Sequence, residues 1–246
     1  MPLISKRVLV VGSVILLYGA VLYSIYTNFP ELDADEKQHF KYPRNLDDAK
    51  ALGKVLSKYK DQHFYTVLVG VAAIYIVLQS FAIPGSIFLT ILSGYLFPFP
   101  VALGLVCTCS ALGAAVCYCL SYLVGRTLVT TYFPERVAQW QTEIQKHREN
   151  LFNYIIVLRI TPVLPNWFIN IASPVIDVSL TPFFWGTLVG VAPPSMLFIQ
   201  AGTTLQEMVN ANVMWSWTSI ITIIVSAIVS LLPVVYRKYA NKAKSE

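Results

Sequence analysis

The sequence predicts an all-α integral membrane protein, a multi-span bundle with two opposed re-entrant helical hairpins that form an inverted repeat. The first observation is composition: of 246 residues, 56% are hydrophobic and 13% are charged, about half the charged fraction of an average soluble domain. The second is a series of apolar segments that approach the roughly 20 residues needed to cross a bilayer. The third is the proline and glycine that interrupt two of these segments.

This composition also excludes several classes of protein. A soluble globular domain and a disordered tail do not fit the low charge content. A nucleic-acid binder is excluded because the net charge of +5 has no large polar face to occupy.

Residues 1–27 are predicted to be a short N-terminal tail and a signal-anchor helix. Segment 8–27 contains no charged residue and follows the basic pair Lys6 and Arg7. Its apolar run is longer than the ~7–15 residues of a cleavable signal peptide, and no A-x-A-like cleavage site follows it. We therefore favour a retained anchor over a cleaved signal.

Residues 28–63 are predicted to be a polar loop with one amphipathic helix lying on a surface. The loop carries seven Lys or Arg residues and seven Asp or Glu residues. Asn45 is the expected N-cap, and Ala49, Leu52 and Leu56 follow it at helical spacing.

Residues 64–236 are predicted to form the membrane domain, and residues 237–246 a basic cytosolic tail. Together with the anchor, the expected uninterrupted spans are 8–27, 64–83, 101–124 and 217–236.

The polar stretch 126–150 separates two parts of the membrane domain. It places Val137, Trp140 and Ile144 at helical spacing, which predicts an amphipathic helix at the membrane interface. The basic ends of the chain favour a cytosolic location for both termini. The basic residues of loop 28–63 argue for the opposite orientation.

The tail carries lysines at the third and fifth positions from its end, Lys242 and Lys244. This K-x-K-x-x pattern matches the cytosolic dilysine signal that returns proteins to the endoplasmic reticulum, which is an address read by a receptor. An ordinary basic tail that follows the positive-inside rule is the alternative.

The two hairpins are predicted from residues that interrupt helices inside apolar segments: Pro84, Gly85 and Gly94 in the first, and Pro162, Pro165 and Pro174 in the second. Residues 88–94 can be laid over residues 168–174 without a gap. Because proline removes a backbone donor, the freed backbone groups must face protein or a wet cavity. Two such segments in corresponding positions indicate a transporter-type site at a repeat interface. Two proline-kinked spans packed on their neighbours are the alternative.

Polar side chains near the hairpin tips are candidates to line that site: Ser86, Thr90, Ser93, Asn166 and Asn170. Arg159 joins them because it lies in an apolar run, where a guanidinium costs at least ~2.5–3.5 kcal/mol. Arg159 should face a cavity or donate to carbonyls freed by the broken helix, and a functional and a structural role are both open. Asp177 is a conceivable partner, although an interfacial position suits it better.

No other chemistry is predicted. Four cysteines, Cys107, Cys109, Cys117 and Cys119, lie in one apolar helix, where residues two apart do not face each other. They are expected to be packing residues, so neither a metal nor a cofactor is expected. The sequence contains no catalytic motif, which predicts that the protein is not an enzyme.

Several strings resemble the VTT-domain proteins of the DedA superfamily: Phe81–Ser86, Cys119–Arg126, Leu158–Pro162 and Pro165–Asn170. Within that superfamily the chain is most similar to the transmembrane protein 41 group, in particular its stasimon-like B type. The superfamily features are the spacing of Gly113, Gly125 and Arg126, and the R-x-x-P motif of Arg159 and Pro162. The resemblance covers roughly residues 64–236.

The resemblance implies a protein of the endoplasmic reticulum membrane that scrambles phospholipids between leaflets without ATP. It further implies support of autophagosome formation and lipid homeostasis, with phospholipids and autophagy-related membrane proteins as partners; movement of sterol stays open. Bacterial members carry acidic residues at the first hairpin, whereas this chain has no Asp or Glu between Gln62 and Pro134. That absence disfavours the alternative of an ion- or proton-coupled transporter. A non-transporting scaffold at membrane contact sites is the other alternative.

Overall fold

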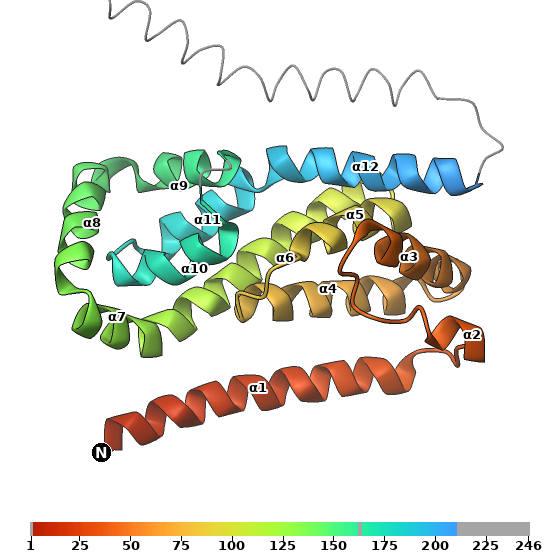
Figure 1. The fold of residues 1–246 in the computed structure, drawn as a ribbon, viewed down its shortest axis with the longest axis horizontal. Helices are drawn as coiled ribbons and strands as arrows, with labels where there is room; N and C mark the ends of the chain where they lie inside the picture. The colour runs from red at the N-terminus through yellow and green to blue at the C-terminus, as the bar shows by residue number, and fades with distance from the viewer. Residues whose placement is uncertain (1, 162–163, 211–246) are drawn as a thin grey trace, which may run out of the picture.

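The computed structural model describes residues 2–161 and 164–210, and the regular elements in that part of the chain are all helices (Figure 1). The first are α1 (Pro2–Asn28), α2 (Ala34–Lys37), α3 (Leu46–Lys60), α4 (Phe64–Ser80), α5 (Ser86–Leu96) and α6 (Phe99–Leu120). The next are the π-helix η1 (Ser121–Gly125), α7 (Arg126–Tyr132), α8 (Pro134–Lys146) and the 3₁₀ turn η2 (Arg148–Asn150). The last are α9 (Leu151–Ile160), α10 (Asn166–Val175), α11 (Leu180–Gly190) and α12 (Ala192–Asn210). The predicted span 217–236, the tail with Lys242 and Lys244, and Pro162 lie outside the described residues.

Three helical stretches among the described residues are long and apolar enough to cross a membrane: Arg7–Asn28, Phe99–Gly125 and Leu180–Met208. The first two agree with the predicted spans 8–27 and 101–124. The predicted span 64–83 is shorter than expected, because α4 ends at Ser80. The all-helical membrane protein is therefore confirmed.

The stretch Leu180–Met208 was not expected to be an uninterrupted span. Pro193 and Pro194 both lie in the first turn of α12. Backbone N–H groups of a first turn have no intrahelical partner, so proline is tolerated there. Helices α11 and α12 consequently follow each other with only Val191 between them.

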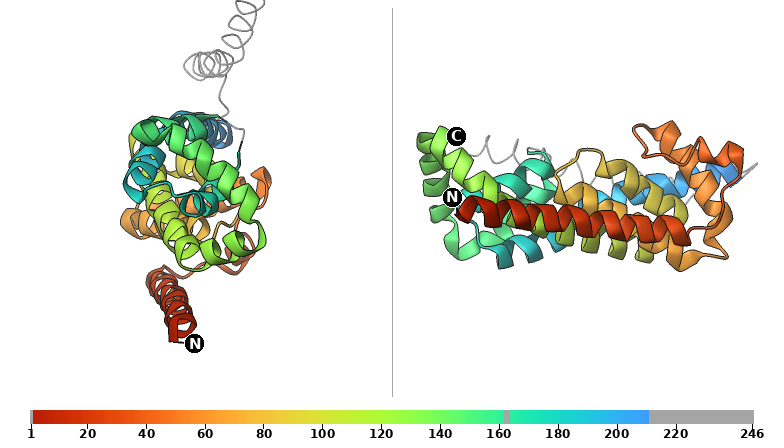
Figure 2. Two further views of the ribbon diagram at one scale, coloured as in Figure 1. Left: turned by 90° about the vertical axis from the view of Figure 1, so that its left-hand side faces the viewer. Right: turned by 90° about the horizontal axis from the view of Figure 1, so that it is seen from below.

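Helix α1 runs beside the rest of the molecule and not within it (Figures 1 and 2). It packs mainly on α4, and many of its apolar side chains are exposed, as suits contact with lipid. Two side-chain hydrogen bonds attach it: Tyr18 Oη to Ser80 Oγ at 2.8 Å, and Arg7 Nη1 to Thr127 Oγ1 at 3.0 Å.

The amphipathic helix predicted after Asn45 is α3. The side chain of Asn45 accepts a hydrogen bond from the Asp48 N–H at 2.7 Å, which confirms the N-cap. The apolar face, including Leu52 and Leu56, packs on α5 and α4. The apolar face of α3 therefore has the predicted spacing, and it packs against other helices of the protein.

A buried carboxylate fixes the segment before α3. Glu36 accepts hydrogen bonds from Lys58 Nζ at 2.6 Å, from Tyr59 Oη at 2.5 Å and from the Asp33 N–H at 3.3 Å. The bond from Lys58, followed by the bond from Tyr59, lowers the pKa of Glu36 below its usual value. In turn the Glu36 carboxylate raises the pKa of Tyr59 to about 12.

This carboxylate should make the loop sensitive to acid. A carboxyl group with a lowered folded-state pKa stabilises the fold above its usual pKa of 4.5, and this contribution is lost as the pH falls through the folded-state pKa. We expect hydrogen exchange of residues 29–41, corrected for intrinsic rates, to accelerate over that range. Glu36→Gln should show the accelerated exchange already at neutral pH. Protection equal to wild type in Glu36→Gln would contradict this role.

The two interrupted segments share one order of elements: a helix, a break, a short helix and another helix. In the first the order is α4, α5, α6, and in the second it is α9, α10, α11. In both, the helix before the break packs along the helix after the short one, α4 on α6 and α9 on α11. The first break is residues 81–85, which contain the predicted breakers Pro84 and Gly85. The second follows α9, and the predicted breaker Pro165 directly precedes α10.

Two predicted breakers do not break a helix. Gly94 lies inside α5, where a Cβ atom would overlap the backbone carbonyl of Ile199 in α12. It is therefore a packing residue. Pro174 lies inside α10, which continues to Val175. Its missing N–H removes only one hydrogen bond, and that bond belongs to the final turn. Pro174 therefore does not divide α10, which ends one residue later.

The predicted interfacial helix at 126–150 is divided into α7 and α8. Helix α8 crosses one end of the molecule at a steep angle to α6 (Figure 1). Val137 and Ile144 are buried, while Trp140 is 41% exposed. The amphipathic face is therefore present as predicted, and Trp140 lies at its edge.

Candidate functional site

The buried centre of the molecule is the guanidinium of Arg159, near the end of α9. The residue is only 5% exposed. It makes five hydrogen bonds: Nε to Thr187 Oγ1 at 3.2 Å, Nη1 to Asn166 O at 3.2 Å and Asn166 Oδ1 at 3.1 Å, and Nη2 to Asn170 Oδ1 at 2.6 Å and Thr187 Oγ1 at 3.0 Å. The expected bond to a backbone carbonyl beside the broken helix is present. Arg159 thereby joins α9 to α10 and α11.

All the acceptors around Arg159 are uncharged. The face of Phe183 adds a cation–π contact, with the guanidinium carbon 5.4 Å from the ring centroid. Asp177, which sequence analysis weighed as a partner, pairs instead with Arg126 at 2.6 Å and accepts from Gln141 Nε2 at 2.7 Å. The cationic centre is thus held by neutral groups inside the membrane domain.

The polar network continues into the first interrupted segment. Asn170 Nδ2 donates to Gln79 Oε1 at 3.4 Å, which links α10 to the end of α4. Nearby, Tyr75 Oη lies 3.1 Å from Thr90 Oγ1 and accepts from Ser110 Oγ at 3.2 Å. Buried polar groups need such partners, since an unpaired one costs roughly 1–3 kcal/mol.

Gln79 and Thr187 were missed by the sequence analysis. For Gln79 a signal existed: it precedes Phe88 by the same interval that separates Arg159 from Phe168. The overlay of 88–94 on 168–174 therefore also places Gln79 on Arg159. Thr187 had no such signal, because its role depends on how α11 packs against α9.

The contacts of the two segments agree with this overlay. Ser93 Oγ donates to Leu89 O at 2.7 Å, and Ser173 Oγ donates to Ile169 O, also at 2.7 Å. A second correspondence involves close helix crossings. A Cβ atom added at Gly113 in α6 would lie against Gln79 and Ile76 of α4. A Cβ atom added at Gly190 in α11 would lie against Arg159 and Ile156 of α9.

The remaining candidates occupy different positions. Thr90, Ser93 and Asn170 are buried, whereas Asn166 is exposed and Ser86 is half-buried at the start of α5. Gly125 lies against the Ser121 side chain, and Ser121 Oγ donates to Ile171 O at 2.8 Å. The structure therefore brings together Arg159, Asn166 and Asn170 directly, and Thr90 through Tyr75.

The first break is covered by the loop that follows α1. Tyr42 Oη donates to Pro84 O at 3.2 Å. Gly85 has a φ of +111°, and a Cβ atom there would overlap the Tyr42 hydroxyl. Glycine is required at this position because other residues rarely adopt such a φ.

Gly85→Ala should therefore destabilise the first interrupted segment. Strain at such a backbone position costs about 1–3 kcal/mol, and the overlap with Tyr42 adds to it. We expect a lower melting temperature of the purified protein in detergent. Ala82→Gly is the matched control, because Ala82 has a φ of 55° and glycine would relieve strain there. An unchanged melting temperature in Gly85→Ala would contradict the requirement.

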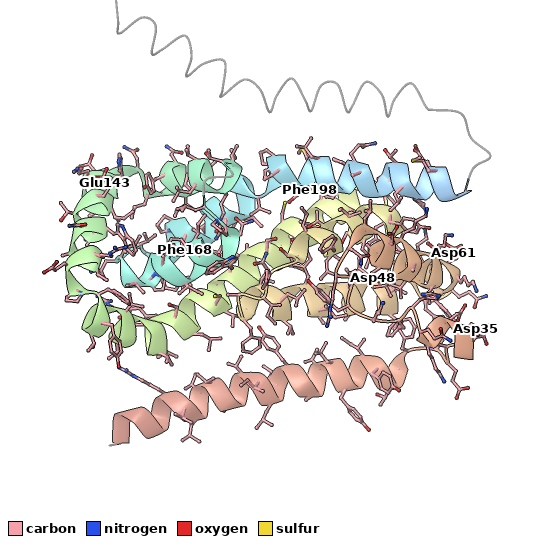
Figure 3. The ribbon with its side chains drawn as sticks, in the orientation of Figure 1. Asp35, Asp48, Asp61, Glu143, Phe168 and Phe198 are labelled. Atoms are coloured by element: carbon pink, nitrogen blue, oxygen red, sulfur yellow. The ribbon has the colours of Figure 1, made fainter. Side chains whose placement is uncertain are left out.

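No metal-binding constellation accompanies the network: within residues 2–161 and 164–210, no three His, Cys, Asp or Glu side chains gather. Cys107, Cys109 and Cys117 are buried and unpaired. Three of the acidic residues labelled in Figure 3 lie toward the ends of the bundle, Asp61 and Asp35 beside α2 and α3, and Glu143 beside α8.

Comparison with known proteins places the chain in a family. Residues 83–204 match the family model described as the VTT domain. The chain is 60% identical to a transmembrane protein 41 homolog of Caenorhabditis elegans over 229 residues, which cover 93% of this chain and 92% of the relative. The chain belongs to the transmembrane protein 41 family.

Other members of the transmembrane protein 41 family are similar over nearly the same length. The human transmembrane protein 41B is 56% identical over 94% of this chain and 79% of its own, and that of Danio rerio is 58% identical over 89% and 78%. No solved structure matches. The VTT domain contains Arg159, Asn170 and Thr187 but not Gln79, which lies before it. The polar network therefore extends beyond the VTT domain.

Proposed function

We propose that this protein is an ATP-independent phospholipid scramblase that moves lipids between leaflets along a path at the two interrupted segments. The observation that carries the proposal is the buried, cationic polar network around Arg159 in a membrane domain. A lipid headgroup cannot enter hydrocarbon unless polar groups replace its hydration, since burial without hydrogen bonds costs several kcal/mol. Movement of the short helices would expose Asn170 and Arg159, which would supply those groups together with Asn166, already exposed at the start of α10.

The hairpins belong to the same proposal. We infer that α5 and α10 form re-entrant hairpins, related as an inverted repeat. The inference is supported by the shared order of elements and by the matching contacts of Gln79 with Gly113 and of Arg159 with Gly190. In such folds the substrate site lies where the repeats meet. Here the bond from Asn170 to Gln79 lies between the two repeats.

Passive movement is favoured over ion coupling. Proton-coupled sites depend on a titrating carrier, typically a carboxylate or histidine chain. No Asp or Glu occurs between Gln62 and Pro134, and Asp177 is already paired with Arg126. The path proposed here therefore needs neither ATP nor an ion gradient.

We further propose the endoplasmic reticulum membrane as the location, with both termini in the cytosol. The basic pair Lys6 and Arg7 and the tail lysines Lys242 and Lys244 support this orientation. From the resemblance to scramblases of that membrane, we also propose that the protein contributes to autophagosome formation and lipid homeostasis. Autophagy-related membrane proteins would then be partners.

The test is lipid scrambling by the purified protein in sealed liposomes, with and without an imposed proton gradient. We expect a rate that does not change when the gradient is applied or when ATP is added. A gradient-dependent uptake of solute, without scrambling, would favour the secondary transporter. Absence of both activities, in protein that is folded and correctly inserted, would favour a scaffold at contact sites.

A further inference from the structure

A cavity of about 830 Å³ lies between α1 and α4, and none of the residues that line it belongs to the Arg159 network. Its walls come from the last turns of α1, from residues 29–43, and from α3, α4 and α5. They include the apolar side chains Leu22, Ile25, Leu56, Val71, Ile74 and Leu89. The volume falls within the range of about 300–1,000 Å³ that is typical of small-molecule sites.

The polar groups of this cavity are few and lie on one side of it. They are Tyr26 and Thr27 at the end of α1, and Glu31, Lys37, Lys41 and Tyr42 in the segment that follows. Lys41 is paired with Asp48 at 3.0 Å. Lys37 makes no ion pair with any residue that the structure describes. An apolar cavity that is also lined by the unpaired ammonium of Lys37 suits an amphiphile with an anionic headgroup.

We propose that this cavity binds an acyl chain of an anionic membrane phospholipid, with the chain between α1 and α4 and the phosphate near Lys37. Helix α1 is a candidate membrane span whose apolar side chains are widely exposed, so phospholipid is the amphiphile that surrounds it. The apolar walls come from α1, α3 and α4. Together these helices provide an apolar surface along the length of an acyl chain. The bound lipid would join α1 to the body. This site is separate from the proposed lipid path and does not depend on transport.

The test uses a photoactivatable anionic phospholipid, phosphatidylglycerol with a diazirine in its acyl chain, added to the purified protein in detergent. We expect labelled peptides from α1 and α4 at residues that line the cavity. Gly70→Leu should lower the yield of these adducts at least fivefold. A Cβ atom at Gly70 meets only Ile25 Cγ2, at the ordinary contact distance of 3.6 Å, and Gly70 lines the cavity, so we expect the leucine side chain to extend into it.

Gly104→Leu is the matched control. It makes the same substitution in another apolar helix, at a position with nothing within 4 Å of a Cβ atom and outside the cavity. We expect wild-type labelling from this variant. If Gly70→Leu does not fold, judged by its melting temperature, Ile74→Trp fills the same cavity and takes its place. Equal labelling in the folded cavity variant and the control would overturn the proposal.

Two further arms identify the ligand. Lys37→Glu should reduce labelling by the anionic probe more than labelling by a phosphatidylcholine probe. A diazirine fatty acid should compete weakly, because it lacks the phosphate that the proposal places near Lys37. Labelling by the fatty acid alone, or adducts only at other helices, would overturn the assignment. Binding is measured at equilibrium, so a negative result here leaves the scrambling test unaffected, and the reverse also holds.

Discussion

Arg159→Lys should lower the scrambling rate at least about tenfold and lower the melting temperature. Lysine keeps the positive charge but has three donors on one atom, so it cannot reach Asn166, Asn170 and Thr187 together. Hydrogen bonds to charged groups contribute about 1.5–3 kcal/mol each, and about 1.4 kcal/mol corresponds to a tenfold change in rate. The measurement is the scrambling rate per protein copy, alongside thermal melting in detergent.

The matched control for this variant is Arg126→Lys. Arg126 is 36% exposed at its side chain and makes an ion pair with Asp177, which a lysine can replace. Its scrambling rate and melting temperature should stay close to wild type. If Arg159→Lys were indistinguishable from Arg126→Lys in both measurements, the network around Arg159 would not be needed for activity.

Gly94→Ala should separate α5 from α12 and destabilise the protein strongly. A Cβ atom at Gly94 overlaps the carbonyl of Ile199, and one at Gly202 overlaps the carbonyl of Ile91, so the two backbones touch through paired glycines. Thr203 Oγ1 donates to Gly94 O at 3.2 Å across the same crossing. Overpacking costs about 1–3 kcal/mol, which corresponds to a fall in melting temperature of roughly 2–12 °C for a chain of this size.

The control for this substitution is Gly104→Ala in α6. Alanine is favoured over glycine within a helix by about 1 kcal/mol, and Gly104 has open space around it. Its melting temperature should therefore stay the same or rise. A Gly94→Ala protein as stable as Gly104→Ala would show that α5 and α12 do not pack through their backbones.

The elements predicted well from the sequence are those whose signals are local. The uncharged run 8–27 predicted the central part of α1, and Asn45 predicted the start of α3 at the correct residue. The helical spacing of Val137 and Ile144 predicted the buried face of α8. Each of these depends on neighbouring residues along one helix, so no tertiary information is needed.

The errors concern residues whose role depends on another helix. Gly94 was interpreted as a helix breaker, but its lack of a side chain allows the backbones of α5 and α12 to approach closely. The stretch Leu180–Met208 was left out of the expected uninterrupted spans, although Pro193 and Pro194 lie in the first turn of α12, where proline is tolerated. Arg159 was recognised because a charge in an apolar run is unusual. Its partner Thr187 is an ordinary residue that only the packing of α11 on α9 reveals.

The most direct measurement of the central claim is the loss of protection of inner-leaflet lipid in liposomes that contain the purified wild-type protein. Fluorescent phospholipid is distributed in both leaflets, a membrane-impermeant quencher is added outside, and neither ATP nor an ion gradient is present. Passive scrambling predicts that the protected inner-leaflet signal disappears rapidly in vesicles with protein and persists in vesicles without it. A protected signal that persists equally in both, with the protein folded and inserted, would contradict the proposed function.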